Sequence, residues 1–149
     1  MKSRKWTFGC AVALVALLLG CDTSTNTQDA SQQQKRETNE NALSGFKQED
    51  ICRATISFLM SQPVNSIEAT SVGDKVQLQY IRSSDQSVWQ QKCYVRGSEV
   101  VWGAKDGRWR NSEFDPKISA EITGNGSLRV IEVYSDGSSR SETFSPEAL

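Results

Sequence analysis

The apolar and polar positions divide the chain into three regions. Residues 6–20 are uncharged and mostly apolar, residues 22–45 are almost entirely polar, and apolar residues recur at regular intervals after that. At the start of the third region the interval is helical, and the apolar face contains Ile51, Ala54, Thr55, Phe58 and Leu59. Two acidic residues precede this face and Pro63 follows it, so the pattern predicts a helix over residues 47–60.

After the helix the apolar period changes to two, which is typical of strands with one buried face. Short turn signals separate the runs, namely Gly73-Asp74, Gly97-Ser98, Gly124-Asn125-Gly126 and Asp136-Gly137. Such spacing predicts successive antiparallel hairpins. The expected fold class is therefore α+β, with one N-terminal helix packed on a curved antiparallel meander sheet of six or seven strands. A partly closed β-barrel is the variant.

Alternation also predicts which strand residues share a face. Two sets of equal parity are Val76, Leu78 and Tyr80, and Val100, Trp102 and Ala104. In residues 128–133 the apolar parity switches between Val130 and Ile131. That switch indicates either a β-bulge or a strand that is covered on both sides.

The beginning of the chain has the pattern of an export signal. Three basic residues are the only charges before the 15-residue uncharged run, which is shorter than the roughly 20 residues of a spanning helix. The end of this run, Leu18-Leu19-Gly20-Cys21, resembles the lipobox of bacterial lipoprotein precursors. The resemblance implies a signal peptide over residues 1–20 and a mature chain that begins at a lipidated Cys21. An ordinary secretory signal or an uncleaved anchor is the alternative.

Asp22 directly follows the predicted lipidated cysteine. In lipoproteins similar to those of enteric bacteria, aspartate at this position favours retention in the inner membrane. The expected location is therefore the periplasmic side of the bacterial inner membrane, with the outer membrane as the alternative. Residues 21–45 are too polar to form a core and would be a disordered tether, with an end-to-end distance of roughly 25 to 30 Å. The globular domain is expected over residues 46–149.

The resemblance also sorts the four cysteines. Cys10 belongs to the signal peptide and Cys21 to the lipid anchor, so Cys52 and Cys93 remain as one pair in an oxidising compartment. We therefore expect a disulfide between them. A zinc site or a catalytic thiol is the alternative, although the chain has no histidine to serve as ligand or base and no C-x-x-C spacing.

The charge balance and motifs exclude several classes of function. Residues 46–149 contain 12 basic and 14 acidic side chains, so the cationic excess that phosphate binding needs is missing and nucleic acid is not expected as a partner. The sequence contains no glycine-rich phosphate loop, nucleophile elbow or metal-ligand cluster. No catalytic residue, metal or cofactor is therefore predicted.

The densest group of interface-type side chains lies in the segment VVWGAKDGRWRN. Its candidate partner-binding residues are Lys105, Arg108, Trp109 and Arg110, because indole and guanidinium groups dominate interface hot spots. The alternative is a hairpin through Asp106-Gly107 whose tryptophans close the sheet and whose cations are solvated.

The expected function follows from the anchor and from the lack of catalytic groups. It is a small protein-binding module of the bacterial envelope, of the inhibitor, exclusion or accessory-subunit type, which contacts the bilayer through acylated Cys21 and an envelope protein through its domain. The alternative is a cell-wall-directed ligand-binding domain or weak hydrolase. That alternative requires Glu113 and Asp115 to converge on a concave pocket with Trp109.

Overall fold

A computed structural model of the chain describes residues 43–149. The predicted signal peptide over residues 1–20, Cys21 and Asp22 lie outside the described residues, as does nearly all of the predicted tether. Leu43, in the range assigned to the tether, is only 6% exposed and packs in the hydrophobic core.

Helix α2 (Gln48–Met60) begins within one residue of its predicted start. The Lys47 backbone N–H donates to the Asp50 carboxylate at 3.1 Å, which satisfies one of the free donors at the first turn. The helix ends where Ser61 adopts a left-handed conformation, two residues before Pro63. The expected N-terminal position is wrong, because the helix begins well inside the chain.

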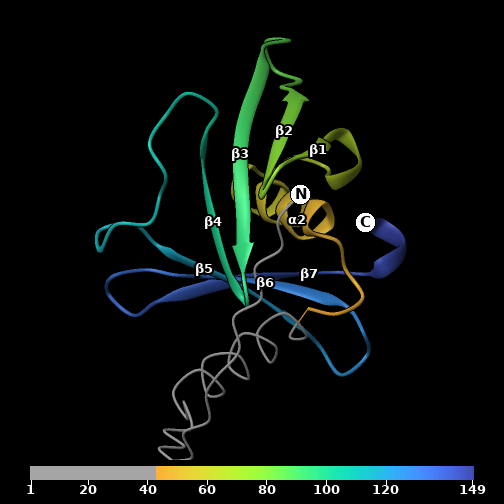
Figure 1. Ribbon diagram of the computed structural model, residues 1–149, viewed down its shortest axis with the longest axis vertical. Coiled ribbons are helices and arrows are strands. Elements are labelled where there is room, and N and C mark those ends of the chain that lie inside the picture. The colour runs from red at the N-terminus through yellow and green to blue at the C-terminus, as the bar shows by residue number, and fades with distance from the viewer. Residues whose placement is uncertain (1–42) are drawn as a thin grey trace, which may run out of the picture.

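The buried face of α2 is wider than the predicted stripe. Its buried apolar side chains include Ile51, Cys52, Ala54, Ile56 and Phe58. The helix contacts strands from both ends of the sheet, as Figure 1 shows. Together these strands bury more of the helix surface than a single apolar stripe. This contact surface is the centre of the hydrophobic core.

Seven strands form one antiparallel sheet in sequence order. They are β1 (Glu68–Val72), β2 (Lys75–Ile81), β3 (Val88–Arg96), β4 (Glu99–Ala104), β5 (Lys117–Ile122), β6 (Leu128–Val133) and β7 (Ser139–Phe144), with the short 3-10 helices η1 (Val64–Ser66) before β1 and η2 (Pro146–Ala148) after β7. The predicted α+β class and antiparallel meander are confirmed. The barrel variant is wrong, since β1 and β7 are the free edges of an open sheet.

The sheet divides into two halves between β4 and β5. These two strands share only the register pairs Glu99 with Ser119 and Val100 with Ile118, whereas every other neighbouring pair of strands aligns over at least five. In Figure 1, β2, β3 and β4 run steeply while β5, β6 and β7 run nearly across them. The strong twist keeps the edges β1 and β7 apart and leaves the sheet open.

The two faces of the sheet differ in what covers them. We call the face that packs on α2 the inner face and the opposite one the outer face. In β2 the predicted alternation is confirmed, since Val76, Leu78 and Tyr80 are buried on the inner face and their neighbours are exposed. The outer face of β2 and β3 carries mostly polar side chains, as expected for a sheet with one solvated face, with Ile81 and Val88 as exposed apolar exceptions.

β4 departs from this alternation. Val100 is buried on the inner face as predicted, but Trp102 is only half-buried and Ala104 is exposed. Val101 and Gly103, on the outer face, are buried as well. The loop that follows β4 accounts for the burial at Gly103, because its backbone passes directly over that residue.

β6 contains no bulge, although the parity switch allowed one. Its pairing with both neighbours is continuous from Leu128 to Val133. The switch arises because Glu132 takes an inner-face position, where its carboxylate accepts hydrogen bonds from the Arg140 guanidinium at 2.5 Å and the Tyr134 hydroxyl at 2.8 Å. Ile131 is consequently on the outer face, where it is half-buried.

The predicted disulfide is confirmed. Cys52 in α2 and Cys93 in β3 are bonded, with their Cα atoms 5.9 Å apart, and both are fully buried. The bond joins the helix to the centre of the sheet at the inner face.

Candidate functional site

The β4–β5 loop, residues 105–116, folds back over the outer face of β4. A turn closes where the Gly107 N–H donates to the Ala104 carbonyl at 3.0 Å, and the Arg110 N–H returns to the Trp102 carbonyl at 2.8 Å. The hairpin-like return through Asp106-Gly107 is therefore present, although its second arm is not a strand. β5 begins only at Lys117.

Gly103 allows the loop to lie this close. A Cβ atom at this position would be 2.4 Å from the Arg108 carbonyl oxygen, closer than any normal contact. The requirement is for space, because the obstructing atom belongs to the backbone and cannot rotate away. Only glycine fits here without moving the loop.

Asp115 stabilises the second half of the loop through hydrogen bonds. Its side chain is 4% exposed and accepts two hydrogen bonds from the Arg108 guanidinium, at 2.6 and 2.7 Å. It also accepts from the Ser112 backbone N–H at 3.0 Å and the Ser112 hydroxyl at 2.6 Å. The hydrogen bonds from Arg108, followed by those from Ser112, hold the pKa of Asp115 well below its usual range. The loop is therefore closed by an ionised carboxylate.

The four predicted partner-binding residues have different roles. Lys105 donates to the Gln90 side-chain carbonyl at 3.2 Å, and Arg108 is committed to Asp115. Arg110 lies over the Trp102 ring, with its guanidinium carbon 4.9 Å from the ring centroid, and reaches Asp115 at 3.9 Å. Lys105, Arg108 and Arg110 are therefore engaged mainly with neighbouring side chains of the same domain. Trp109, in contrast, joins a wider cluster of side chains.

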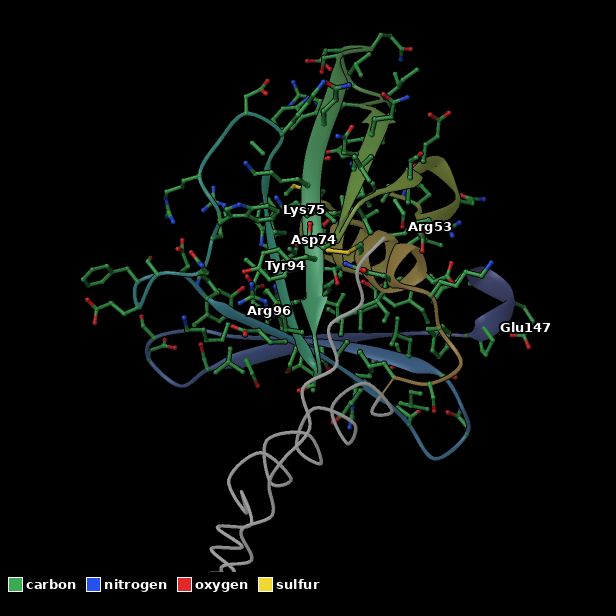
Figure 2. All side chains as sticks on the ribbon, in the orientation of Figure 1. Arg53, Asp74, Lys75, Tyr94, Arg96 and Glu147 are labelled. Carbon is green, nitrogen blue, oxygen red and sulfur yellow. A yellow bond between two sulfur atoms is a disulfide. The ribbon has the colours of Figure 1, made fainter. Side chains whose placement is uncertain are left out.

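That cluster lies on the outer face, and we call it the cation–aromatic cluster: Lys75, Lys92, Tyr94, Arg96 and Trp109. The Trp109 and Tyr94 rings meet edge to face at 4.9 Å between centroids. The Lys92 and Lys75 ammonium nitrogens lie 4.8 and 5.9 Å from the Trp109 centroid, and the Arg96 guanidinium carbon lies 4.8 Å from that of Tyr94. In Figure 2, Lys75 at the start of β2 is labelled near Tyr94 and Arg96 of β3.

The cations of this cluster make no direct ion pair with an acidic side chain of the described residues. Within residues 43–149, Lys75, Lys92 and Arg96 form no salt bridge, in contrast to Arg129, which pairs with Glu121. Three cations around two aromatic rings make a surface suited to an anionic group. Because Cys93 is buried on the inner face, strand alternation directs Lys92, Tyr94 and Arg96 to the outer face, but no sequence pattern shows that Trp109 returns to meet them.

Phe114 is the most exposed large apolar side chain among the described residues, at 85%. It directly precedes Asp115, and the Asp115 backbone N–H donates to the Ser112 carbonyl at 3.3 Å. The ring therefore projects from a turn that is held by the buried carboxylate. Sequence reasoning missed Phe114, because a single phenylalanine in a loop has no periodic pattern that distinguishes an exposed ring from a buried one.

The acid pair of the hydrolase alternative is not assembled. The Asp115 carboxylate is directed at Arg108 and Ser112, while Glu113 is exposed on the surface of the loop. A carboxylate that remains ionised through two guanidinium hydrogen bonds is a poor general acid. Asp115 therefore has a structural role in the loop.

Comparison with protein families, with curated proteins and with solved structures finds no match for this chain. No helix within residues 43–149 is long and apolar enough to cross a membrane. In the same part of the chain, no three metal-ligating side chains are grouped so as to hold an ion.

Proposed function

We propose that this protein is a lipid-anchored, periplasmic protein-binding module of the bacterial envelope, of the inhibitor, exclusion or accessory-subunit type. Its acylated Cys21 holds it on the inner membrane, and its β4–β5 loop and cation–aromatic cluster dock on an envelope protein. The observation that carries the proposal is Phe114, which is 85% exposed on a braced turn.

A fixed exposed ring is an efficient anchor for a partner. Exposing phenylalanine to water is unfavourable, and the ring can bury a large apolar area when a partner covers it. Because Asp115 already fixes the turn, little loop entropy is lost on binding, and this pre-organisation increases affinity. A few such anchors usually supply most of the binding energy of an interface.

The charges near the loop indicate the chemistry of the partner. Lys75 and Arg96 are exposed and lack carboxylate partners among the described residues, and the Arg108 side chain is 62% exposed despite its bond to Asp115. A complementary surface would have an apolar pocket for Phe114 and acidic residues beside it. Such complementarity mainly speeds association and selects the partner, and salt weakens it.

Capture from crosslinked envelopes tests the proposal. Tagged full-length protein is crosslinked in the cells that express it and recovered with its neighbours, alongside Phe114→Ala and Lys75→Glu. We expect a specific partner whose recovery falls about tenfold with Phe114→Ala, the scale of a hot-spot residue. Lys75→Glu should reduce recovery most at low salt, where unscreened attraction is strongest.

Ile81→Ala is the matched control, because Ile81 is also apolar and 59% exposed but lies in β2, at the far end of the strand from Lys75. Its partner recovery should equal that of the unaltered protein. The proposal is wrong if the only proteins recovered are abundant envelope components that Phe114→Ala captures equally well.

A further inference from the structure

A row of hydrogen-bonded side chains crosses the outer face at right angles to the strands. The Gln79 amide donates to the Glu68 carboxylate at 2.6 Å, the Gln90 amide donates to the Gln79 carbonyl at 3.3 Å, and the Lys105 ammonium donates to the Gln90 carbonyl at 3.2 Å. We call these four residues the amide row. They lie side by side because Glu68, Gln79 and Gln90 are register partners in β1, β2 and β3.

The ends of the row fix the orientation of both amides. Glu68 can only accept hydrogen bonds and Lys105 can only donate them, so each glutamine between them must donate toward Glu68 and accept from the Lys105 side. Each amide uses one of its two N–H groups and one of its two carbonyl lone pairs in the row. One N–H and one lone pair therefore remain on each amide for a ligand.

The row lines a hollow in the outer face. A shallow pocket of about 220 Å³ is bordered by all four residues, with Thr70 and Gln77 beside them. A neighbouring pocket of about 300 Å³ shares Glu68 and Gln79 and is walled by Ile81 and Val88. Ile81 and Val88 are direct register partners, and they are 59% and 61% exposed. The polar amide row therefore adjoins an exposed apolar pair, Ile81 and Val88, which we call the apolar step.

We propose that the amide row is a binding site for a neutral glycan that carries acetamido groups. A sugar hydroxyl both donates and accepts, which matches the donor and acceptor that remain on each amide. The single Glu68 charge balances the single Lys105 charge, so the row has no excess charge to attract an anion. The strand spacing of about 4.8 Å is close to the length of one sugar unit in a β-1,4-linked glycan, so successive units can follow successive strands.

The apolar step accounts for the acetamido preference. Ile81 and Val88 offer exposed methyl groups beside the amide row. An acetyl methyl group that packs against them is removed from water. The backbones of β2 and β3 are paired with a neighbouring strand on both sides, so recognition over these two strands depends on their side chains. The site does not include Phe114 or the cation–aromatic cluster, and Lys105 is the one residue that it shares with the β4–β5 loop.

Titration of the full chain in detergent with soluble oligosaccharides tests the inference. The probes are a β-1,4-linked tetramer of N-acetylglucosamine and the glucose tetramer with the same linkage, followed by calorimetry. We expect saturable binding of the acetylated tetramer and a loss of about tenfold in the double variant Gln79→Ala/Gln90→Ala, which removes the two oriented amides. Ile81→Ser should abolish the preference over the glucose tetramer.

Gln48→Ala is the matched control, since Gln48 is in α2 and donates to the Asp74 carbonyl away from the row. Its affinity should be unchanged, and thermal unfolding should show that every variant is folded. Equal affinity for the two tetramers, no saturable binding of either, or undiminished binding by the double variant would overturn the inference. Phe114→Ala should retain glycan binding, so failure here leaves the protein-docking result intact.

Discussion

Gly103 determines how closely the β4–β5 loop approaches the sheet, so it is the sharpest single-residue test of this arrangement. In Gly103→Ala the added Cβ would meet the Arg108 carbonyl oxygen at 2.4 Å, and the loop must move. We expect a loss of about 1 to 3 kcal/mol in the free energy of unfolding, the usual cost of an overpacked site. Urea unfolding measures the loss.

The displaced loop should also carry Trp109 away from Tyr94, which tryptophan fluorescence would report as a shift toward a solvent-exposed emission. Gly124→Ala is the control, because a Cβ at that turn meets no atom within 4 Å. Equal stability of the two variants would contradict the close approach of the loop to β4.

At the same scale, the residues show what sequence could and could not predict about the site. Trp109 is predicted from its residue type alone, and the period of two in β3 gives Lys92 and Tyr94 a common face. Their meeting depends on a loop return that no local pattern records. The pairing of Asp115 with Arg108 has no local pattern either, because the two residues are seven apart in sequence and become adjacent only after the turn forms.

At the scale of elements, strand and helix positions were predictable because each is encoded locally. The period of two and the glycine turns define the hairpins, and the helix of residues 48–60 has a strong apolar face. The division between β4 and β5 was not predictable. It depends on the sheet twist and on the loop of residues 105–116, which is longer than any other connection between neighbouring strands.

The disulfide is the element-scale feature with the largest expected effect on stability. Cys52→Ala/Cys93→Ala removes a bond between residues 41 apart, and the chain-entropy model gives a loss of roughly 4 kcal/mol. Urea unfolding of the double variant, compared with the reduced unaltered protein, measures it. The two should have similar midpoints, both well below that of the oxidised protein. A midpoint unchanged by removal of the bond would show that the helix needs no covalent tie to β3.

At the scale of the whole molecule, the two proposed surfaces share the outer face, while α2 and the core occupy the inner one. Leu43, the first described residue, packs in that core. With an anchor at Cys21 and a span of roughly 25 to 30 Å for the predicted tether, the domain would reach only targets close to the membrane.

The anchor is the last prediction, and it decides whether this geometry applies. Cys21→Ser should abolish acylation and alter membrane retention, because the two or three acyl chains that give durable membrane binding would be missing. Labelling with a fatty-acid analogue and fractionation of membranes measure both effects. Cys10→Ser, which alters a cysteine inside the predicted signal peptide, should remain acylated. Label that persists in Cys21→Ser would place the lipid elsewhere, and the limit on the domain's reach would no longer hold.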